Sequence, residues 1–133
     1  MRVDFDDDPA WERVRDAALA PLRPGGAASL VVIEDRAYEG LDLSGLAKAP
    51  EDYGERVLIV FDAQTRKRPD NPLLVIDWLA EIDEEDEDRY IPRSMRATPE
   101  QVLSIEVNLS IANMDFDDYV ANADPDGVFR GFR

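Results

Sequence analysis

The chain of 133 residues has the length of one domain, and its hydrophobic share of 44% is that of an ordinary globular protein. It contains neither cysteine nor histidine, which excludes disulfides, a thiol nucleophile, and the commonest general base and zinc ligand. The formal net charge of −15 disfavours nucleic acid and anionic lipid as partners and favours a basic protein, although solubility alone would also explain it.

We expect a single domain over residues 1–133 that is cytoplasmic and does not enter a membrane. No apolar run approaches the ~20 residues that a membrane-spanning helix needs. The amino terminus, Met1-Arg2-Val3-Asp4, lacks the apolar region of a signal peptide. The composition implies no cofactor, and it leaves the oligomeric state open.

The first part of the chain predicts a strand, a helix and another strand. Residues 3–5 are a candidate short strand, and Asp8 and Pro9 suit the N-cap and the first position of a helix. The apolar run 29–33 is typical of a strand that is covered on both faces. A short helix is expected around residues 43–48.

The middle of the chain predicts three more strands. Residues 56–62 and 73–79 are apolar runs of the buried kind, and the basic, proline-bounded connection 64–72 indicates a long hairpin loop between them. The acidic block 83–88 is typical of a solvated loop. Residues 89–92 predict a further strand at a sheet edge, because a proline ends it.

The carboxy-terminal part predicts two helices and a docked tail. Thr98 and Gln101 have the spacing of a capping box, which predicts a helix that begins after Thr98 and runs through residues 101–114. Apolar residues also alternate within that segment, as in a strand, but the capping signal decides for a helix. Asp115 can cap a last short helix, and the aromatic residues of the tail, Phe129 foremost, are expected to dock on the core.

Together these elements predict an α/β domain of the α+β kind. Their order is strand, helix, strand, short helix, three strands and two helices, which lacks the regular alternation of a doubly wound fold. We therefore expect a mixed, mostly antiparallel sheet of about four or five strands with helices packed on it.

Two stretches of the sequence resemble a known family. They are Asn108-Leu109-Ser110-Ile111-Ala112-Asn113-Met114-Asp115-Phe116 and Asp4-Phe5-Asp6-Asp7-Asp8-Pro9-Ala10-Trp11. In them the chain is similar to the small acidic actinobacterial proteins known as domain of unknown function 6924. The chain departs from that family in a shorter first strand and a longer acidic block. The resemblance supports a single domain and implies no mechanism.

The acidic block is the first candidate binding surface, because its charge could attract a basic partner. It comprises Asp83, Glu84, Glu85, Asp86, Glu87 and Asp88. A solvated loop is the simpler explanation. Asn108, Asn113 and Asp115 are a second candidate, since asparagine is a poor residue inside a helix. A structural amide at Asn108 and a left-handed helix end at Asn113 are the alternatives.

Carboxylates are the only plausible metal ligands in this composition. Asp4, Asp6 and Asp118 could hold Mg²⁺ for phosphoryl transfer, with one carboxylate as nucleophile, but no suitable lysine follows a strand. Asp124 and Asp126 have the spacing of a calcium loop, but an arginine stands where that loop needs its bidentate glutamate. Helix capping and turn formation explain these aspartates better.

One basic cluster, Arg66-Lys67-Arg68, stands out against the acidic background. It could pair with the acidic block of a second copy of the chain, or it could offset charge within its own copy. The sequence leaves both alternatives open.

The sequence favours a non-enzymatic cytosolic binding protein that engages a basic protein partner, with an immunity or regulatory role as the most specific form. The net charge, the missing catalytic residue types and the acidic block motivate this hypothesis. The alternatives are a carboxylate-based divalent-metal enzyme of the phosphoryl-transfer type and a ligand-free structural or oligomeric module.

Overall fold

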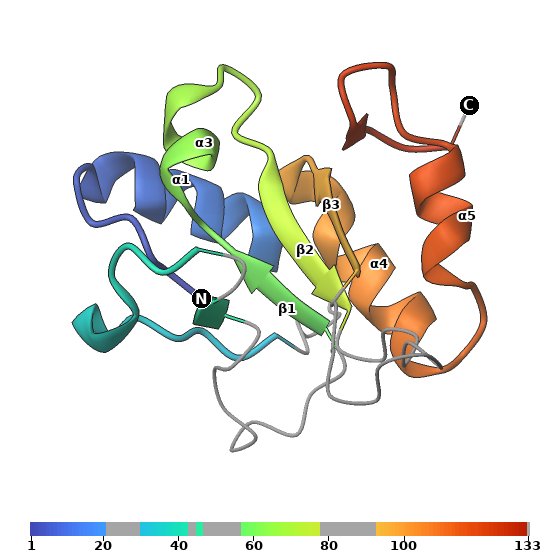
Figure 1. Cartoon of the computed structure of the whole chain (residues 1–133), viewed down its shortest axis with the longest axis horizontal. Coiled ribbons are helices and arrows are strands. Elements are labelled where there is room, and N and C mark those ends of the chain that lie inside the picture. Colours follow the sequence, from blue (N-terminus) through green and yellow to red (C-terminus); the bar gives the residue numbers. More distant parts are fainter. Residues whose placement is uncertain (21–29, 43–44, 47–56, 78–92, 133) are drawn as a thin grey trace.

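The computed structural model describes residues 1–20, 30–42, 45–46, 57–77 and 93–132 (Figure 1). Its elements are, in chain order, α1 (Asp8–Leu19), the short 3-10 helix η1 (Arg36–Tyr38), β1 (Val57–Val60), α3 (Ala63–Lys67), β2 (Leu73–Asp77), β3 (Arg93–Ala97), α4 (Pro99–Ser110), α5 (Phe116–Ala121) and β4 (Val128–Phe129). None of the helices in the described part is both long and apolar enough to cross a membrane.

Four strands form one sheet in the order β1-β2-β3-β4. The first three are antiparallel neighbours, with Ile59 opposite Val75 and Val75 opposite Met95. The short strand β4 lies parallel to β3 and pairs through Val128 and Phe129. The expected α+β domain with a mixed, mostly antiparallel sheet is therefore confirmed.

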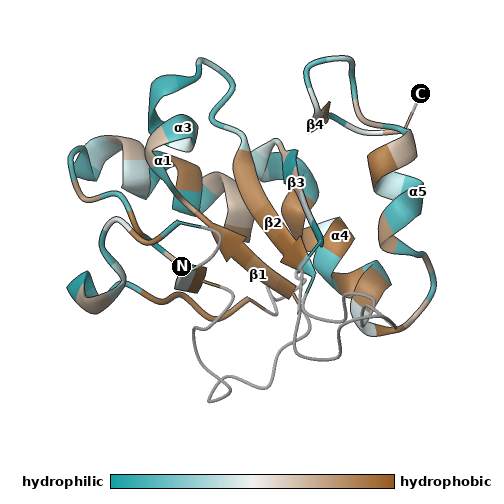
Figure 2. Cartoon of the chain, in the orientation of Figure 1, coloured by the Kyte–Doolittle hydropathy of each residue, from teal (hydrophilic) through white to brown (hydrophobic). Residues whose placement is uncertain are grey.

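Helices cover one face of this sheet. Because side chains alternate along a strand, Ile59, Val75 and Met95 point to the same face, where they join the larger apolar cluster. Helices α1 and α4 pack against each other and lie behind the sheet in Figure 1, while α5 lies at the right-hand side of that view. Trp11 of α1 meets Phe61 edge-to-face, with ring centroids 5.5 Å apart. Figure 2 shows β1 and β2 as mainly apolar, whereas the helices carry both apolar and polar residues.

The opposite face is covered by the amino-terminal segment and by described residues between positions 33 and 46. Val60 and Ile76 point to this face and form a second apolar cluster with Met1, Val3 and Leu46. The amino-terminal segment is held beside β1 by backbone hydrogen bonds. Val3 N donates to Phe61 O at 2.9 Å, and Phe61 N donates to Met1 O at 2.9 Å. The strand expected near residues 3–5 is thus a short parallel pairing, with its bridge at Arg2.

The prediction of a buried strand at 29–33 is wrong for the residues that the structure describes. Residues 30–33 form no strand, and Val31 is 75% exposed. The physical reason is the place of the amino-terminal segment. Arg2 bridges Phe61 on one side and Glu34 on the other, so this part of the chain lies outside the segment that already covers the edge of β1.

Two elements of the structure, helix α3 and strand β3, were not predicted from the sequence. The connection between β1 and β2 is a hairpin connection as predicted, but it contains the helix α3. Strand β3 follows the position of the predicted edge strand 89–92, which lies outside the described residues. Because β3 has β2 on one side and β4 on the other, it is an interior strand.

The helix ends follow the predictions to within a few residues. The N-cap of α1 is Asp7 rather than Asp8, and its carboxylate accepts from Ala10 N at 3.0 Å. Helix α4 begins after Thr98 as expected, although the Thr98 side chain makes no capping hydrogen bond. It ends at Ser110, and the left-handed residue beyond it is Ala112, with φ of 55°, rather than Asn113. The expected helix after Asp115 is α5.

Candidate functional site

The predicted binding residues fall into two groups. Asp83–Asp88 lie outside the described residues, so the acidic block stays a prediction. Asn108, Asn113 and Asp115 lie at the end of α4 and the start of α5, and the structure brings the two asparagines into contact.

The amides of this corner are occupied by the chain itself. Asn108 Nδ2 donates to Ser104 O at 2.9 Å, and Asn108 Oδ1 accepts from Asn113 Nδ2 at 3.0 Å. The backbone oxygen of Asn108 also accepts from Asn113 N at 2.9 Å. Asp115 N donates to the carboxylate of Asp118 at 2.9 Å. These contacts end α4 and begin α5, which favours the structural explanation of Asn108 and Asn113 and makes Asp115 the N-cap of α5.

Tyr119 lies beneath this corner and was not predicted as a functional residue. Its ring is 1% exposed, and its hydroxyl donates to Met114 Sδ at 3.3 Å. Burial raises the pKa of the Tyr119 phenol, against the opposing effect of a hydrogen bond with Asn108. The phenol is therefore protonated at neutral pH and acts as a core residue with a polar tip.

The aspartates of the hypothetical magnesium site are bound by other groups of the chain. Arg66 Nε donates to Asp4 Oδ1 at 2.9 Å, and Arg66 Nη2 donates to Asp6 Oδ2 at 3.4 Å. The hydrogen bond with Asp4 raises the pKa of the Arg66 guanidinium. Asp118 belongs instead to the start of α5. Within the described ranges no three acidic side chains are grouped to hold a metal ion.

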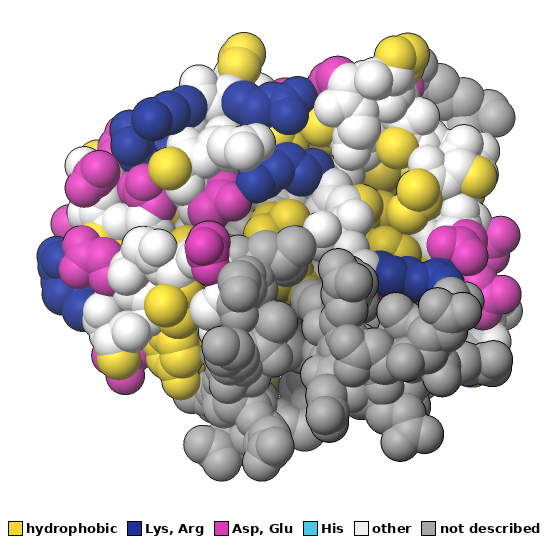
Figure 3. Space-filling model, in the orientation of Figure 1, with side chains coloured by type: hydrophobic (Ala, Val, Ile, Leu, Met, Phe, Trp, Pro, Cys, Tyr) yellow, Lys and Arg dark blue, Asp and Glu magenta, His cyan; other side chains and the backbone are white. Residues whose placement is uncertain are grey.

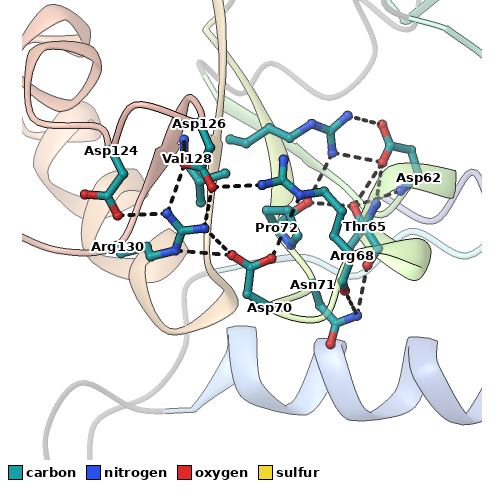
Figure 4. Close-up of polar contacts among 11 residues, drawn as sticks. Asp62, Thr65, Arg68, Asp70, Asn71, Pro72, Asp124, Asp126, Val128 and Arg130 are labelled. Atoms are coloured by element: carbon teal, nitrogen blue, oxygen red, sulfur yellow. Dashed lines mark hydrogen bonds and ion pairs between the residues drawn. The ribbon is translucent and has the colours of Figure 1, made fainter.

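The turn that resembles a calcium loop is filled by an arginine (Figure 4). Arg130 Nη1 and Nη2 donate to the two oxygens of Asp126 at 3.0 and 2.7 Å. Arg130 Nη1 also donates to Asp124 at 2.8 Å, and Arg130 Nη2 donates to Asp70 at 2.5 Å. The hydrogen bond from Arg130 lowers the pKa of Asp126 to about 2. The guanidinium thus takes the position among carboxylates that a cation would need.

A second arginine, Arg96 of β3, binds residues next to the ends of β1 and β2 (Figure 4). Arg96 Nη1 and Nη2 donate to the two oxygens of Asp62 at 3.0 and 2.6 Å, and Nη1 also donates to Pro72 O at 3.1 Å. Thr65, which is fully buried, donates its hydroxyl to Pro72 O at 2.9 Å. Burial acts to raise the pKa of Asp62, but the hydrogen bonds from Arg96 and Thr65 outweigh it and lower the pKa.

Comparison with known proteins gives one match. The family model for domain of unknown function 6924 matches residues 1–132. The chain belongs to this family. No curated protein and no solved structure gives a significant match. The resemblance inferred from the aspartate-rich and asparagine-rich stretches is confirmed, and membership assigns no activity to this family member.

Most of the described basic side chains of this family member form ion pairs within the chain. Of its 15 lysines and arginines, five lie outside the described ranges, and eight of the other ten make ion pairs. The eight are Arg2, Arg15, Arg36, Arg66, Arg68, Arg93, Arg96 and Arg130. The cluster Arg66-Lys67-Arg68 follows this rule, since Arg66 pairs with Asp4 and Arg68 with Asp126. Its arginines therefore offset charge within their own copy.

Some of the residues in the clusters around Arg96 and Arg130 could have been predicted from the sequence. Asp62 and Thr65 have the spacing of a capping box, and both halves of the box form at the start of α3. Arg130 carries no comparable local signal for its contact with Asp70, because the two residues are 60 positions apart.

Proposed function

We propose that this protein is a non-enzymatic binding protein that engages a basic protein partner through its acidic surface. The observation that carries the proposal is the internal use of the arginines. Each ion pair cancels one positive and one negative charge, so the net charge of −15 is carried mainly by carboxylates outside these pairs, and those are the ones that a partner meets.

The described surface offers such carboxylates in two regions. Figure 3 shows Asp and Glu side chains at one side of this view, over α1 and the segments near it, and at the opposite side, over α5. Exposed acidic residues of these regions include Asp7, Glu12, Asp35 and Asp118. A protein with clustered lysines or arginines would be drawn to this surface, quickly and with strong salt dependence.

The same contacts weigh against the alternative of a metal enzyme. Asp4 and Asp6 bind Arg66, whereas Asp118 binds the backbone at the start of α5. To share one ion, Asp4 and Asp6 would have to leave Arg66, and Asp118 would have to leave the start of α5. The binding proposal requires no such rearrangement.

The first experiment is capture from lysate of the native host with the immobilised chain. Capture is done at low salt and at ~0.5 M salt, where exposed charges are screened, and with an excess of polylysine as a nonspecific competitor. We expect one basic protein that is retained against polylysine and released by salt. Recovery of no basic protein at either salt concentration would contradict the proposal.

The second experiment tests which carboxylates are used. One variant carries Glu84→Gln, Glu85→Gln, Asp86→Asn and Glu87→Gln in the acidic block. The matched control removes the same charge from other described exposed residues, three of which are paired with an arginine, with Asp16→Asn, Glu39→Gln, Asp117→Asn and Glu100→Gln. Titration calorimetry with the captured protein should show a larger loss of affinity for the first variant. Equal losses would mean that net charge alone acts and that the acidic block is no specific site.

An immunity or regulatory role is the most specific form of this proposal. In that role the chain would block an activity of the basic partner. The captured protein is therefore assayed for its own activity with and without one equivalent of the chain. Inhibition supports the role, and full activity in the saturated complex would exclude it.

A further inference from the structure

The turn between α5 and β4 contains an aspartate followed by glycine, Asp126-Gly127. Gly127 has φ of 82°, which glycine adopts without strain, and nothing lies within 4 Å of the position that a Cβ would take there. Among aspartyl peptide bonds, Asp-Gly is the most prone to rearrangement, because no side chain shields the glycine nitrogen from the carboxyl group before it.

The rearrangement needs no partner other than water. Gly127 N attacks Asp126 Cγ, so an N–C bond forms and the Cγ–OH bond breaks, and the nitrogen's proton leaves with the hydroxyl as water. The succinimide that results is then hydrolysed at either carbonyl carbon. One product is the original aspartate, and the other is isoaspartate, in which the main chain runs through the former side chain.

The folded turn opposes the first step at both reacting groups. Asp126 Oδ1 accepts from Val128 N at 3.1 Å and from Arg130, and Oδ2 accepts from Arg130 and from Arg68 Nη2 at 3.0 Å. A carboxylate held in this way stays ionised and is a poor electrophile. The nitrogen that would attack is also engaged, because Gly127 N donates to Asp124 O at 2.8 Å.

We propose that Asp126-Gly127 is an isoaspartate-forming site that the folded turn keeps unreactive, with Arg68 and Arg130 as positioning residues for the carboxylate. The modification would add one methylene to the main chain two residues before β4. Val128 and Phe129 would then lose their register with Arg96 and Ala97 of β3. Opening of this turn is thereby coupled to a covalent change that prevents the tail from docking again.

The test compares rates of isoaspartate formation at neutral pH and physiological temperature. Isoaspartate is measured by transfer of a labelled methyl group with protein isoaspartyl methyltransferase, and peptide mapping assigns it to residue 126. Wild-type chain in buffer is compared with wild-type chain in urea, Arg68→Ala and Arg130→Ala. Arg15→Ala is the matched control, because Arg15 pairs with Asp16 on α1.

We expect the native wild type to react at least about tenfold more slowly than the chain in urea, the factor that corresponds to one charge-assisted hydrogen bond. Arg68→Ala and Arg130→Ala should react faster than wild type, and Arg15→Ala should match it. Equal rates for native and urea-treated wild type would overturn the proposal. Rates of isoaspartate formation equal to that of the native wild type in both Arg68→Ala and Arg130→Ala would also overturn the proposal. If Arg130→Ala does not fold, Arg68→Ala decides, because it leaves the Arg130 contacts in place and its folding is checked by circular dichroism.

Discussion

Phe129 and Phe132 stand three residues apart in the tail, and replacing each by alanine should give very different losses of stability. Both rings contact Tyr119, with centroids 5.1 and 5.5 Å away. Phe129 is 1% exposed, so Phe129→Ala leaves a cavity and should lower the free energy of unfolding by about 3–5 kcal/mol. Phe132 is 52% exposed, so Phe132→Ala forfeits only half of the burial of one ring, about 1 kcal/mol.

Urea unfolding followed by tryptophan fluorescence measures the two losses. For a slope of roughly 1.5 kcal/mol per molar urea, the midpoint should fall by about 2–3 M in Phe129→Ala and by less than about 1 M in Phe132→Ala. Phe132→Ala serves as the matched control, because it removes the same ring from the same segment. Similar losses in the two variants, or a loss below about 1 kcal/mol in Phe129→Ala, would refute the docking of the tail through Phe129.

Three further sets of substitutions test parts of the fold. The folded-state pKa of Asp62 lies below its usual 3.8, so its pairing with Arg96 stabilises the fold above pH 3.8 and is lost as the pH falls further; the urea midpoints of wild type and Asp62→Asn should therefore converge in acid. Thr65→Val removes a buried hydroxyl and should cost about 1–3 kcal/mol in thermal unfolding, most of which Thr65→Ser should restore. Ala112→Gly should raise the free energy of unfolding by about 1 kcal/mol, because Ala112 holds a φ of 55°. Asn71→Gly, at a φ of 48°, should lower it instead, because the Asn71 amide donates two hydrogen bonds to neighbouring carbonyl oxygens; equal signs for the two glycine variants would contradict this reasoning.

The elements found from the sequence are those whose signal is local. Helix α1 has a proline near its start and apolar residues at helical spacing, and β1 and β2 are short apolar runs. Strand β3 was missed because Arg93, Ser94 and Arg96 occupy three of its five positions. Only Met95 and Ala97 of β3 face the apolar cluster, so the strand is defined by pairing with β2 rather than by its own composition.

The apolar run 29–33 was predicted as a strand, whereas its described residues form none. Its composition is that of a buried strand, but burial depends on which segments lie beside it. Arg2 pairs with Phe61 next to β1, and the chain near Glu34 lies beyond that pairing. A local pattern carries no information about such an order of segments, because it is set by contacts between residues 2, 34 and 61.

The side chains at the end of α4 could be identified from the sequence, but their role could not. Asparagine inside a helix is unusual, which selected Asn108 and Asn113 correctly as residues with a specific contact. The contact is internal, and the sequence could not separate this outcome from ligand binding. Arg130 was missed for a related reason, since Asp70 lies 60 residues away and comes near only in the folded chain.

The arginine pairs divide the carboxylates of this chain into two classes with different expected effects. Exposed ion pairs contribute only about 0–1 kcal/mol each, so the arginines matter chiefly because they neutralise particular carboxylates. Asp62, Asp70 and Asp126 each bind an arginine of the same chain, and a basic partner would have to displace that arginine to use them. Substitutions at these three should therefore change stability and leave affinity for a basic partner nearly unaltered. Substitutions within the acidic block 83–88 should do the reverse, and this crossed pattern separates a binding surface from charge that only maintains the fold.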